Sequence, residues 1–288
     1  MSDELEAASD IIRTRAGEAP IEMAVILSSG LVDAVGDLQN ETVIPYADLP
    51  GFPLSRSFGQ ENKLQIGELE GVRIACLKGR SHYFETGSAA GMALPLEVMA
   101  MLGVSTLMVT STCGSVDADA YPGSLALVTD HINLSGMSPL HGASSEGSTF
   151  SLAKAYDERL LLRMKRAALS AGVTLRDGVY MQFPGPTFET PAEVRMARMI
   201  GANMIGMSGV HEVVLARRLN LRTCFVGAIT YFGAGFNKSD PNYLETRVMA
   251  RQAAIGLRRL IRSFLVTKEG PYVADTPRPS ILRKQALT

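Results

Sequence analysis

One short stretch of this sequence, FPGPTFETPAE at residues 183–193, constrains the backbone more tightly than any other. It follows a strand-like run, GVYMQ, and precedes a run of helical composition, VRMARMIGA. Two prolines flanking a glycine must turn the chain, because proline fixes its own φ and restricts the residue before it. Thr190 stands three residues before Glu193, which is the spacing of a capping box, and a proline occupies the first helical position. The sequence therefore predicts a rigid turn from a strand into a helix.

This turn holds an aromatic ring and a carboxylate, Phe188 and Glu189, at fixed positions near the carboxyl end of the preceding strand. Open α/β proteins bind their ligands at the carboxyl ends of strands. An aromatic face beside a carboxylate suits a flat ligand that donates hydrogen bonds. The turn is therefore the first candidate for a binding site.

The rest of the chain alternates between strand-like and helix-like segments, with no linker between them. Helices are expected at residues 3–16, 90–102, 153–171, 191–201, 210–219 and 245–266, and strands at 22–27, 72–79, 105–110, 124–134, 178–182, 204–207 and 222–230. Long loops are expected at residues 45–62, 135–150 and 231–243. The alternation predicts one α/β domain over residues 1–288 with a largely parallel central sheet. We expect the tail at residues 271–288, with its prolines and basic residues, to be mobile.

Composition excludes several classes of function. With 288 residues and 46% hydrophobic content, the chain can bury a sizeable core. It has no run of about eighteen apolar residues, and its N-terminal segment lacks the apolar stretch of a signal peptide, so we expect no membrane partner. A net charge of −1 gives no general attraction to nucleic acid. Three scattered cysteines indicate neither a disulfide framework nor a metal site, so we expect a cytoplasmic protein without a bound metal.

Four strand ends carry side chains that suit an anion. Ser29 lies in a Ser-Ser-Gly turn, which offers backbone N–H groups and hydroxyl donors. Arg80 provides a planar fork of donors matched to phosphate, and His82 can add a donor on the same side of an extended segment. Thr112 follows another strand, and Ser208 stands at a helix N-terminus, where anions are favoured. Taken singly, the serine turn can be only a turn, and the arginine and histidine can be ordinary loop residues.

Other patterns do not indicate a site. Cys113 reads as a small buried hydrophobe rather than a nucleophile, because no spacing supports catalysis there. Asp130 and His131 are adjacent in a strand, so their side chains cannot share one face as a catalytic dyad. The sequence contains no P-loop, dinucleotide fingerprint, metal motif or nucleophile elbow.

Seven segments give the sequence a resemblance to a known family. They are ILSSGL, LPGFP, KGRSHYFE, VTSTCGS, DHINL, FPGPTFETPAE and IGMSGVHEVVLAR, and they extend from about residue 24 to residue 265. The chain resembles the trimeric class of purine nucleoside phosphorylases, which includes the methylthioadenosine phosphorylases and the bacterial xanthosine phosphorylases. The resemblance implies a single domain with a distorted mixed central β-sheet flanked by helices, assembled as a homotrimer. It also implies a transferase of purine salvage that uses inorganic phosphate as its co-substrate and no cofactor.

The same resemblance implies roles for particular residues. The phosphate-binding set is Ser29, Arg80, His82, Thr112 and Ser208. The base-binding set is Cys113, Gly114, Phe188, Glu189 and Tyr231. The ribose-binding set is Phe84, Met207, Tyr243 and, from the neighbouring subunit, Phe150. The catalytic residues are His82 and Glu189, and no metal is implied.

Several positions depart from the family pattern and leave three functions open. Tyr231 stands where the family has an asparagine that bonds the purine, Tyr243 where it has a histidine near the 5′-hydroxyl, and Gln60 where it has another histidine. Phe84 replaces a tyrosine, and the residues 111–114 read Ser-Thr-Cys-Gly instead of Asn-Ala-Ala-Gly. The first function is phosphorolysis of inosine or guanosine to the free base and ribose 1-phosphate. The second is a specificity shifted to xanthosine or to a 5′-modified nucleoside such as methylthioadenosine or methylthioinosine. The third is a nucleoside-binding homologue with impaired catalysis.

Overall fold

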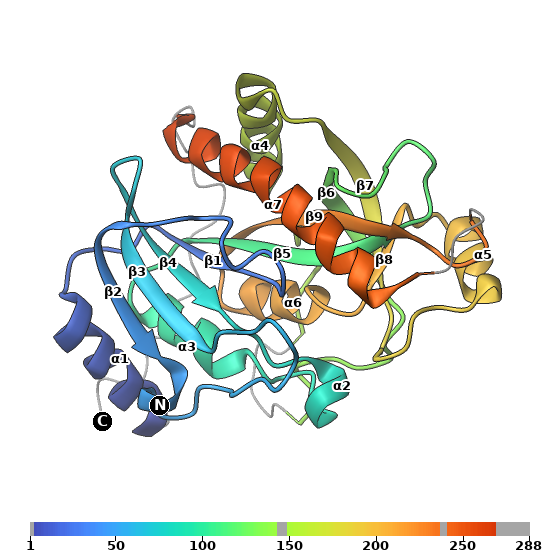
Figure 1. Cartoon of the computed structure of the whole chain (residues 1–288). Coiled ribbons are helices and arrows are strands. Elements are labelled where there is room, and N and C mark those ends of the chain that lie inside the picture. Colours follow the sequence, from blue (N-terminus) through green and yellow to red (C-terminus); the bar gives the residue numbers. More distant parts are fainter. Residues whose placement is uncertain (1–2, 143–148, 237–240, 269–288) are drawn as a thin grey trace.

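The computed structural model of the chain describes residues 3–142, 149–236 and 241–268 (Figure 1). Its strands are β1 (Met23–Ile26), β2 (Gln39–Pro45), β3 (Lys63–Leu69), β4 (Val72–Lys78), β5 (Thr106–Ser115), β6 (Leu125–Asn133), β7 (Leu175–Gln182), β8 (Met204–Gly206) and β9 (Arg222–Phe232). Its helices are α1 (Asp3–Ala16), α2 (Tyr83–Thr86), α3 (Ala93–Met101), α4 (Glu158–Ala171), α5 (Pro191–Met199), α6 (Val210–Arg218) and α7 (Tyr243–Val266), with a short 3-10 helix, η1 (Tyr46–Asp48). The tail at residues 271–288, which the sequence predicts to be mobile, lies outside the described residues.

Within the described residues, nine strands form one sheet in the order β2-β3-β4-β1-β5-β8-β7-β6-β9, and β5 also pairs with β9. That extra pairing joins β5, β8, β7, β6 and β9 into a ring, from which the other four strands extend. The pairs β1–β4, β1–β5, β5–β9, β6–β7 and β7–β8 are parallel, and β2–β3, β3–β4, β5–β8 and β6–β9 are antiparallel. The largely parallel sheet expected from the alternation is therefore corrected to a mixed one. The distorted mixed sheet implied by the resemblance is confirmed.

A hairpin accounts for much of the antiparallel pairing. β3 and β4 are joined by Glu70 and Gly71, whose φ angles are 54° and 75°. Two-residue turns with positive φ at both central positions match the twist of antiparallel strands. No strand is expected from the sequence at residues 63–69, so this hairpin was not predicted.

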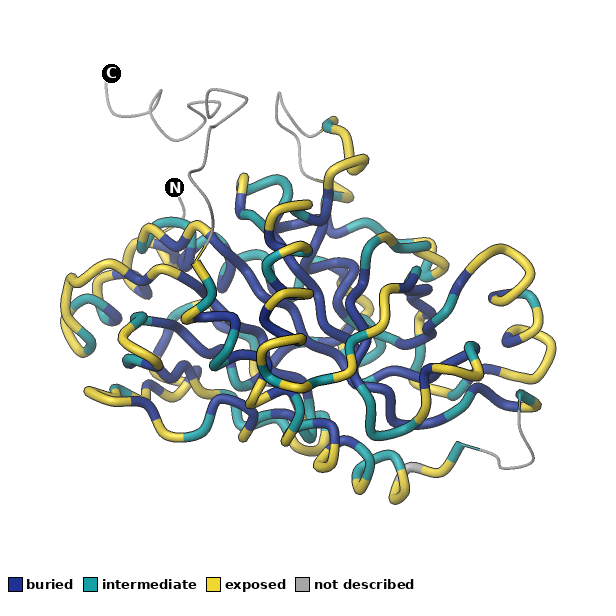
Figure 2. The backbone as a smooth tube through the Cα atoms, turned by 90° about the horizontal axis from the view of Figure 1, so that it is seen from above, coloured by how far each residue is buried: buried dark blue, intermediate teal, exposed yellow. Residues whose placement is uncertain are grey.

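Helices cover both faces of the sheet around its central strand. Helices α1, α3 and α6 pack on one face, and α4 and α7 pack on the other (Figure 1). The β1 side chains alternate accordingly, since Ala24 and Ile26 join the first core while Met23 and Val25 join the second. Figure 2 shows the buried strands at the centre and the exposed residues on the outer turns and loops. A strand covered on both faces in this way fixes the position of the residues that follow it.

Two strands run further than the sequence predicts. β5 continues to Ser115 and β9 to Phe232, and the two pair in parallel almost throughout. The residues 111–114 therefore lie inside a strand rather than in a loop after it. Tyr231 likewise lies in β9 rather than in the loop expected at residues 231–243.

Helix α4 begins later than predicted, at Glu158 instead of residue 153. Asp157 caps it, because its carboxylate accepts hydrogen bonds from the N–H groups of Arg159 and Leu160. The other predicted helices agree with the structure within a few residues at each end. Over the described ranges, none of these helices combines the length and apolar character needed to cross a bilayer.

Candidate active site

The predicted phosphate-binding residues come from neighbouring strand ends. β1 pairs in parallel with both β4 and β5, so the segments that follow β1 and β4 emerge beside the middle of the long strand β5. Thr110 of β5 holds the end of β1 in place, since its hydroxyl donates to the Ile26 carbonyl at 2.8 Å and accepts from the Ser28 N–H at 3.2 Å. Ser29 and Arg80 therefore follow neighbouring parallel strands, as the sequence predicts, whereas Thr112 lies within β5, beyond its pairing with β1.

Arg80 is fully buried in an ion pair. Its Nη1 lies 3.0 Å from Oε1 of Glu212, and its Nη2 donates to the Thr110 carbonyl. The other carboxylate oxygen of Glu212 accepts from the Gly209 N–H at 3.0 Å, at the start of α6. Nε of Arg80 is buried and has no hydrogen-bond partner among the described residues. Glu212 thus fixes the guanidinium against the N-terminus of α6, and one donor stays unpaired. The sequence analysis did not identify this glutamate.

Ser208 lies just before α6, at a helix end where the Gly209 N–H donates to Glu212 and the Val210 N–H donates to Oε1 of Gln182 at 2.8 Å. Its hydroxyl is 2.9 Å from the hydroxyl of Ser111 on β5, and its carbonyl accepts from the Tyr180 hydroxyl at 2.9 Å. Ser29 is placed differently, since its hydroxyl donates to the Phe58 carbonyl at 2.6 Å. A Cβ at Gly59 would come within 2.4 Å of that hydroxyl oxygen, so only glycine lets the loop approach Ser29 this closely.

His82 is held by a carboxylate three residues later. Its Nδ1 lies 2.6 Å from Oε1 of Glu85, and its ring stacks on Phe84 with centroids 4.8 Å apart. Burial alone would raise the pKa of Glu85, but hydrogen bonds from His82, the Arg56 N–H and Ser55 hold that pKa well below its usual range. An ionised Glu85 orients Nδ1–H toward itself and leaves Nε2 for another partner. Glu85 was also missed, although its spacing from His82 is that of a capping box.

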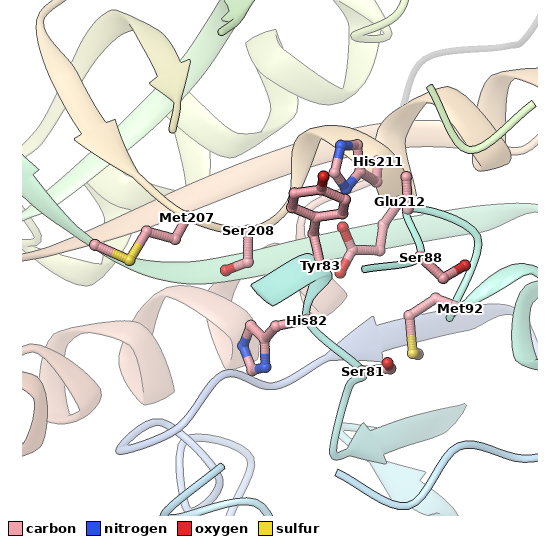
Figure 3. A pocket seen from close by; sticks show the side chains of 10 residues that line it. Ser81, His82, Tyr83, Ser88, Met92, Met207, Ser208, His211 and Glu212 are labelled. Atoms are coloured by element: carbon pink, nitrogen blue, oxygen red, sulfur yellow. The ribbon is translucent and has the colours of Figure 1, made fainter. Parts of the chain in front are cut away.

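A small pocket brings several of these residues together (Figure 3). It is lined by Ser81, His82, Tyr83, Ser88, Ala89, Met92, Met207, Ser208, His211 and Glu212. Three of these, His82, Met207 and Ser208, are predicted site residues. Figure 3 shows Ser208 above His82, with the side chains of His211 and Glu212 from α6 beside them.

The turn at residues 183–193 has the predicted form. The Thr190 N–H donates to Oε2 of Glu193 at 2.7 Å, and the Glu193 N–H donates back to the Thr190 hydroxyl at 3.3 Å. At the other end of the turn, the Phe183 N–H donates to the Gly206 carbonyl at 2.7 Å, directly before Met207. The predicted capping box is therefore confirmed, and the turn lies against the segment that carries Met207 and Ser208.

Glu189 is buried with its two carboxylate oxygens in different states. The side chain is only 4% exposed. Its Oε2 accepts from the Tyr231 hydroxyl at 3.2 Å, whereas its Oε1 is buried with no partner in the described part of the chain. Burial raises the pKa of Glu189 to about 7, against the opposing effect of its own backbone N–H and the Tyr231 hydroxyl. Ionising this carboxyl group is therefore unfavourable, and Oε1 is available to accept a hydrogen bond from a ligand.

The other predicted base-binding residues surround Glu189. Phe188 meets Tyr231 edge to face, with ring centroids 5.0 Å apart. Gly114 lies opposite Tyr231 in the β5–β9 pairing, where a Cβ would come within 2.4 Å of the tyrosine ring. Cys113 is buried, and burial raises the pKa of its thiol well above the usual range. This thiol is therefore unreactive, as the sequence predicts.

The predicted ribose-binding residues are only partly brought together. A Cβ at Gly185 would lie 2.8 Å from the Met207 sulfur and 2.9 Å from Cδ1 of Phe84, so both side chains contact the turn. Phe150 packs, partly buried, against the core of its own chain. Tyr243 begins α7, and its side chain lies outside the described part of the structure.

Comparison with known proteins identifies the family of this chain. Residues 22–266 match the phosphorylase superfamily. Purine nucleoside phosphorylase 1 of Bacillus subtilis (strain 168) is 33% identical over 272 residues, which cover 93% of this chain and 100% of that protein. Purine nucleoside phosphorylase 1 of Geobacillus stearothermophilus is 37% identical over 234 residues, which cover 80% of this chain and 85% of that protein.

Solved structures agree with these relatives. Schistosoma purine nucleoside phosphorylase in complex with guanosine superposes with a TM-score of 0.82 at 28% identity, covering 91% of this chain and 96% of that one. The Schistosoma mansoni enzyme in complex with inosine has a TM-score of 0.83 at 28% identity, covering 93% of this chain and 98% of that one. The chain therefore belongs to the phosphorylase superfamily, among the purine nucleoside phosphorylases.

Proposed function

We propose that this protein catalyses the phosphorolysis of purine nucleosides of the inosine and guanosine type, releasing the free base and forming ribose 1-phosphate. The observation that carries the proposal is Glu189, a buried carboxylate that has one oxygen without a partner among the described residues and that lies beside Phe188. Its turn contacts the segment that bears Met207 and Ser208, and these two residues share a pocket with His82 and with Glu212, the partner of Arg80. The names of the relatives and the nucleosides bound in the solved structures support the same activity.

Cleavage of an N-glycosidic bond by phosphate needs no nucleophile from the protein. A phosphate oxygen attacks the anomeric carbon as the bond to the base breaks, and positive charge develops on the sugar. Arg80, His82 and Ser208, together with Ser29 and the backbone near Thr112, hold the phosphate in line and neutralise it. Glu212 and the Thr110 carbonyl hold the guanidinium, and Glu85 holds the imidazole, so both groups are fixed before phosphate arrives.

The leaving base carries the electrons of the broken bond. Glu189 accepts a hydrogen bond from a ring N–H of the purine, and Phe188 packs on the base. Met207 and Phe84 line the sugar, beside the Gly185 turn. Removing one well-placed donor or acceptor from such a site typically lowers the rate by about 10²- to 10³-fold.

The quaternary and cellular setting belongs to the same proposal. The protein acts as a homotrimer in the cytoplasm, in purine salvage, with Phe150 of each subunit reaching the sugar pocket of its neighbour. Phosphate is its co-substrate, and it uses no cofactor and no metal. A solution mass about three times the 30.9 kDa of the chain is expected from light scattering, and a monomer would contradict the role given to Phe150.

The assay is release of free base from inosine, guanosine, xanthosine and adenosine, with and without phosphate. Release from inosine or guanosine is expected only with phosphate. Glu189→Gln should reduce it about 10²-fold or more, while Glu193→Gln, four residues on and exposed, should retain it. Base release from none of the four nucleosides by the unaltered protein would reject the proposal in favour of a binding homologue.

A further inference from the structure

The two oxygens of Glu189 are not equivalent, and Tyr231 is the reason. The tyrosine hydroxyl donates to Oε2 at 3.2 Å, while Oε1 is left buried with no hydrogen-bond partner in the described ranges. Because Glu189 is only 4% exposed, bulk water does not satisfy Oε1 either. An unpaired buried acceptor is costly unless a ligand satisfies it.

Tyr231 cannot easily turn its hydroxyl elsewhere. It lies in β9 opposite Gly114 of β5, and a Cβ at Gly114 would come within 2.4 Å of its ring. On another side the ring meets Phe188, at 5.0 Å between centroids, and it packs in a core cluster with Phe183 and Val194. The ring is thus held between two strands and the turn, and its hydroxyl is directed at Oε2.

The edge of a 6-oxopurine shows why one occupied oxygen matters. Hypoxanthine presents a single donor at this edge, the N1–H. Guanine presents two adjacent donors, the N1–H and the 2-amino group, which a carboxylate with both oxygens free can accept one on each. A carboxylate whose Oε2 already accepts from a phenol is matched to the first pattern rather than the second.

We propose that Tyr231 is a specificity-determining residue, which engages Oε2 of Glu189, leaves Oε1 for the base, and favours 6-oxopurines with hydrogen at C2 over those with a 2-amino group. The inference rests on the proposed function and names the substrate within it. It gives Tyr231 a role different from a direct contact with the base, because the tyrosine acts through Glu189. Inosine is therefore the expected substrate in preference to guanosine.

The test compares Tyr231→Phe with the unaltered protein at a pH about one unit above the Glu189 pKa, where most of this carboxylate is ionised and the base still carries its N1–H. The ratio of kcat/KM for guanosine to kcat/KM for inosine should rise about tenfold, as expected for a restored hydrogen bond to a charged acceptor. The acid limb of the kcat/KM profile should also move to higher pH, because the hydroxyl that lowers the Glu189 pKa is gone. Tyr156→Phe is the matched control, since it removes a buried hydroxyl bonded to His131 at 2.9 Å and should change neither quantity.

Two outcomes would overturn the inference: a clear preference of the unaltered protein for guanosine, or an unchanged ratio in an active Tyr231→Phe. An unchanged ratio with an equal loss on both nucleosides would mean that the hydroxyl serves the 6-oxo group, which both bases share. If the variant turns over slowly, calorimetry can measure its affinities for free guanine and free hypoxanthine, and the ratio of these affinities replaces the ratio of kcat/KM values. For the unaltered protein, these affinities separate failure of this inference from failure of the proposed activity, since bases can bind without phosphorolysis.

Discussion

Glu212→Gln tests whether the buried ion pair organises the phosphate side of the site. The two side chains are 0% and 5% exposed, and Nη1 and Oε1 are 3.0 Å apart, so solvent screens the pair very little. The substitution keeps the shape but leaves the Arg80 guanidinium buried without a counter-charge. Breaking a buried pair in this way typically costs about 3–5 kcal/mol. We expect the free energy of unfolding to fall by about that amount.

Phosphate should restore part of this loss. If the anion binds against Arg80, it supplies the missing negative charge, so saturating phosphate should stabilise Glu212→Gln more than it stabilises the unaltered protein. The measurement is urea unfolding with and without phosphate, at constant ionic strength. Asp48→Asn is the control, because its partner Arg15 is as close, at 2.5 Å, but the pair is exposed and contributes only about 0–1 kcal/mol. A loss below about 1 kcal/mol in Glu212→Gln, or no extra stabilisation by phosphate, would refute the reasoning.

Four further predictions concern the base side and the histidine. The kcat/KM for inosine should fall as the pH drops below about 7, because protonated Glu189 loses the charge that strengthens its hydrogen bond to the base N–H; a flat profile down to pH 5 would contradict this. Folding raises this carboxyl pKa from 4.5 to about 7, so the protein loses stability as the pH rises between those values. Glu189→Gln should therefore be more stable than the unaltered protein at pH 8, by about 1–3 kcal/mol in the free energy of unfolding measured with urea. Gly114→Ala should lower stability by about 1–3 kcal/mol and raise the KM for inosine, because the new methyl group collides with the Tyr231 ring. Gly136→Ala is the control: a Cβ there would meet nothing within 4 Å, so the KM for inosine should not change. Glu85→Gln should lower kcat/KM about tenfold or more, since it frees the His82 ring, and full activity would show that this orientation is unimportant.

Local signals in the sequence predicted the parts of the site that depend on neighbouring residues. The turn at residues 183–193 is an example, because its prolines and its Thr190–Glu193 capping box act within a few residues of one another. The strand ends at Ser29 and Arg80 were found in the same way. Their common location follows from the parallel pairing of β1 with β4 and β5, although the connection from β1 to β4 contains the strands β2 and β3 rather than an α-helix.

Contacts between distant segments could not be predicted from such signals. Glu212 reads as an ordinary capping glutamate of α6 until the fold places it beside Arg80, 132 residues earlier. The contact of Gly114 with Tyr231 depends on the β5–β9 register, which shifts by one residue between Cys113 and Gly114. A bulge of this kind leaves no clear mark in one sequence, so the hydroxyl of Tyr231 could not be assigned to Glu189 beforehand.

The central claim is that the Arg80, His82 and Ser208 donors and the Glu189 carboxylate act on the two sides of one glycosidic bond. The most direct measurement is ³¹P NMR of inosine, inorganic phosphate and the protein. We predict a new phosphomonoester signal from ribose 1-phosphate that grows in equal amount with hypoxanthine. Hypoxanthine accompanied by free ribose, with the phosphate signal unchanged, would contradict the account.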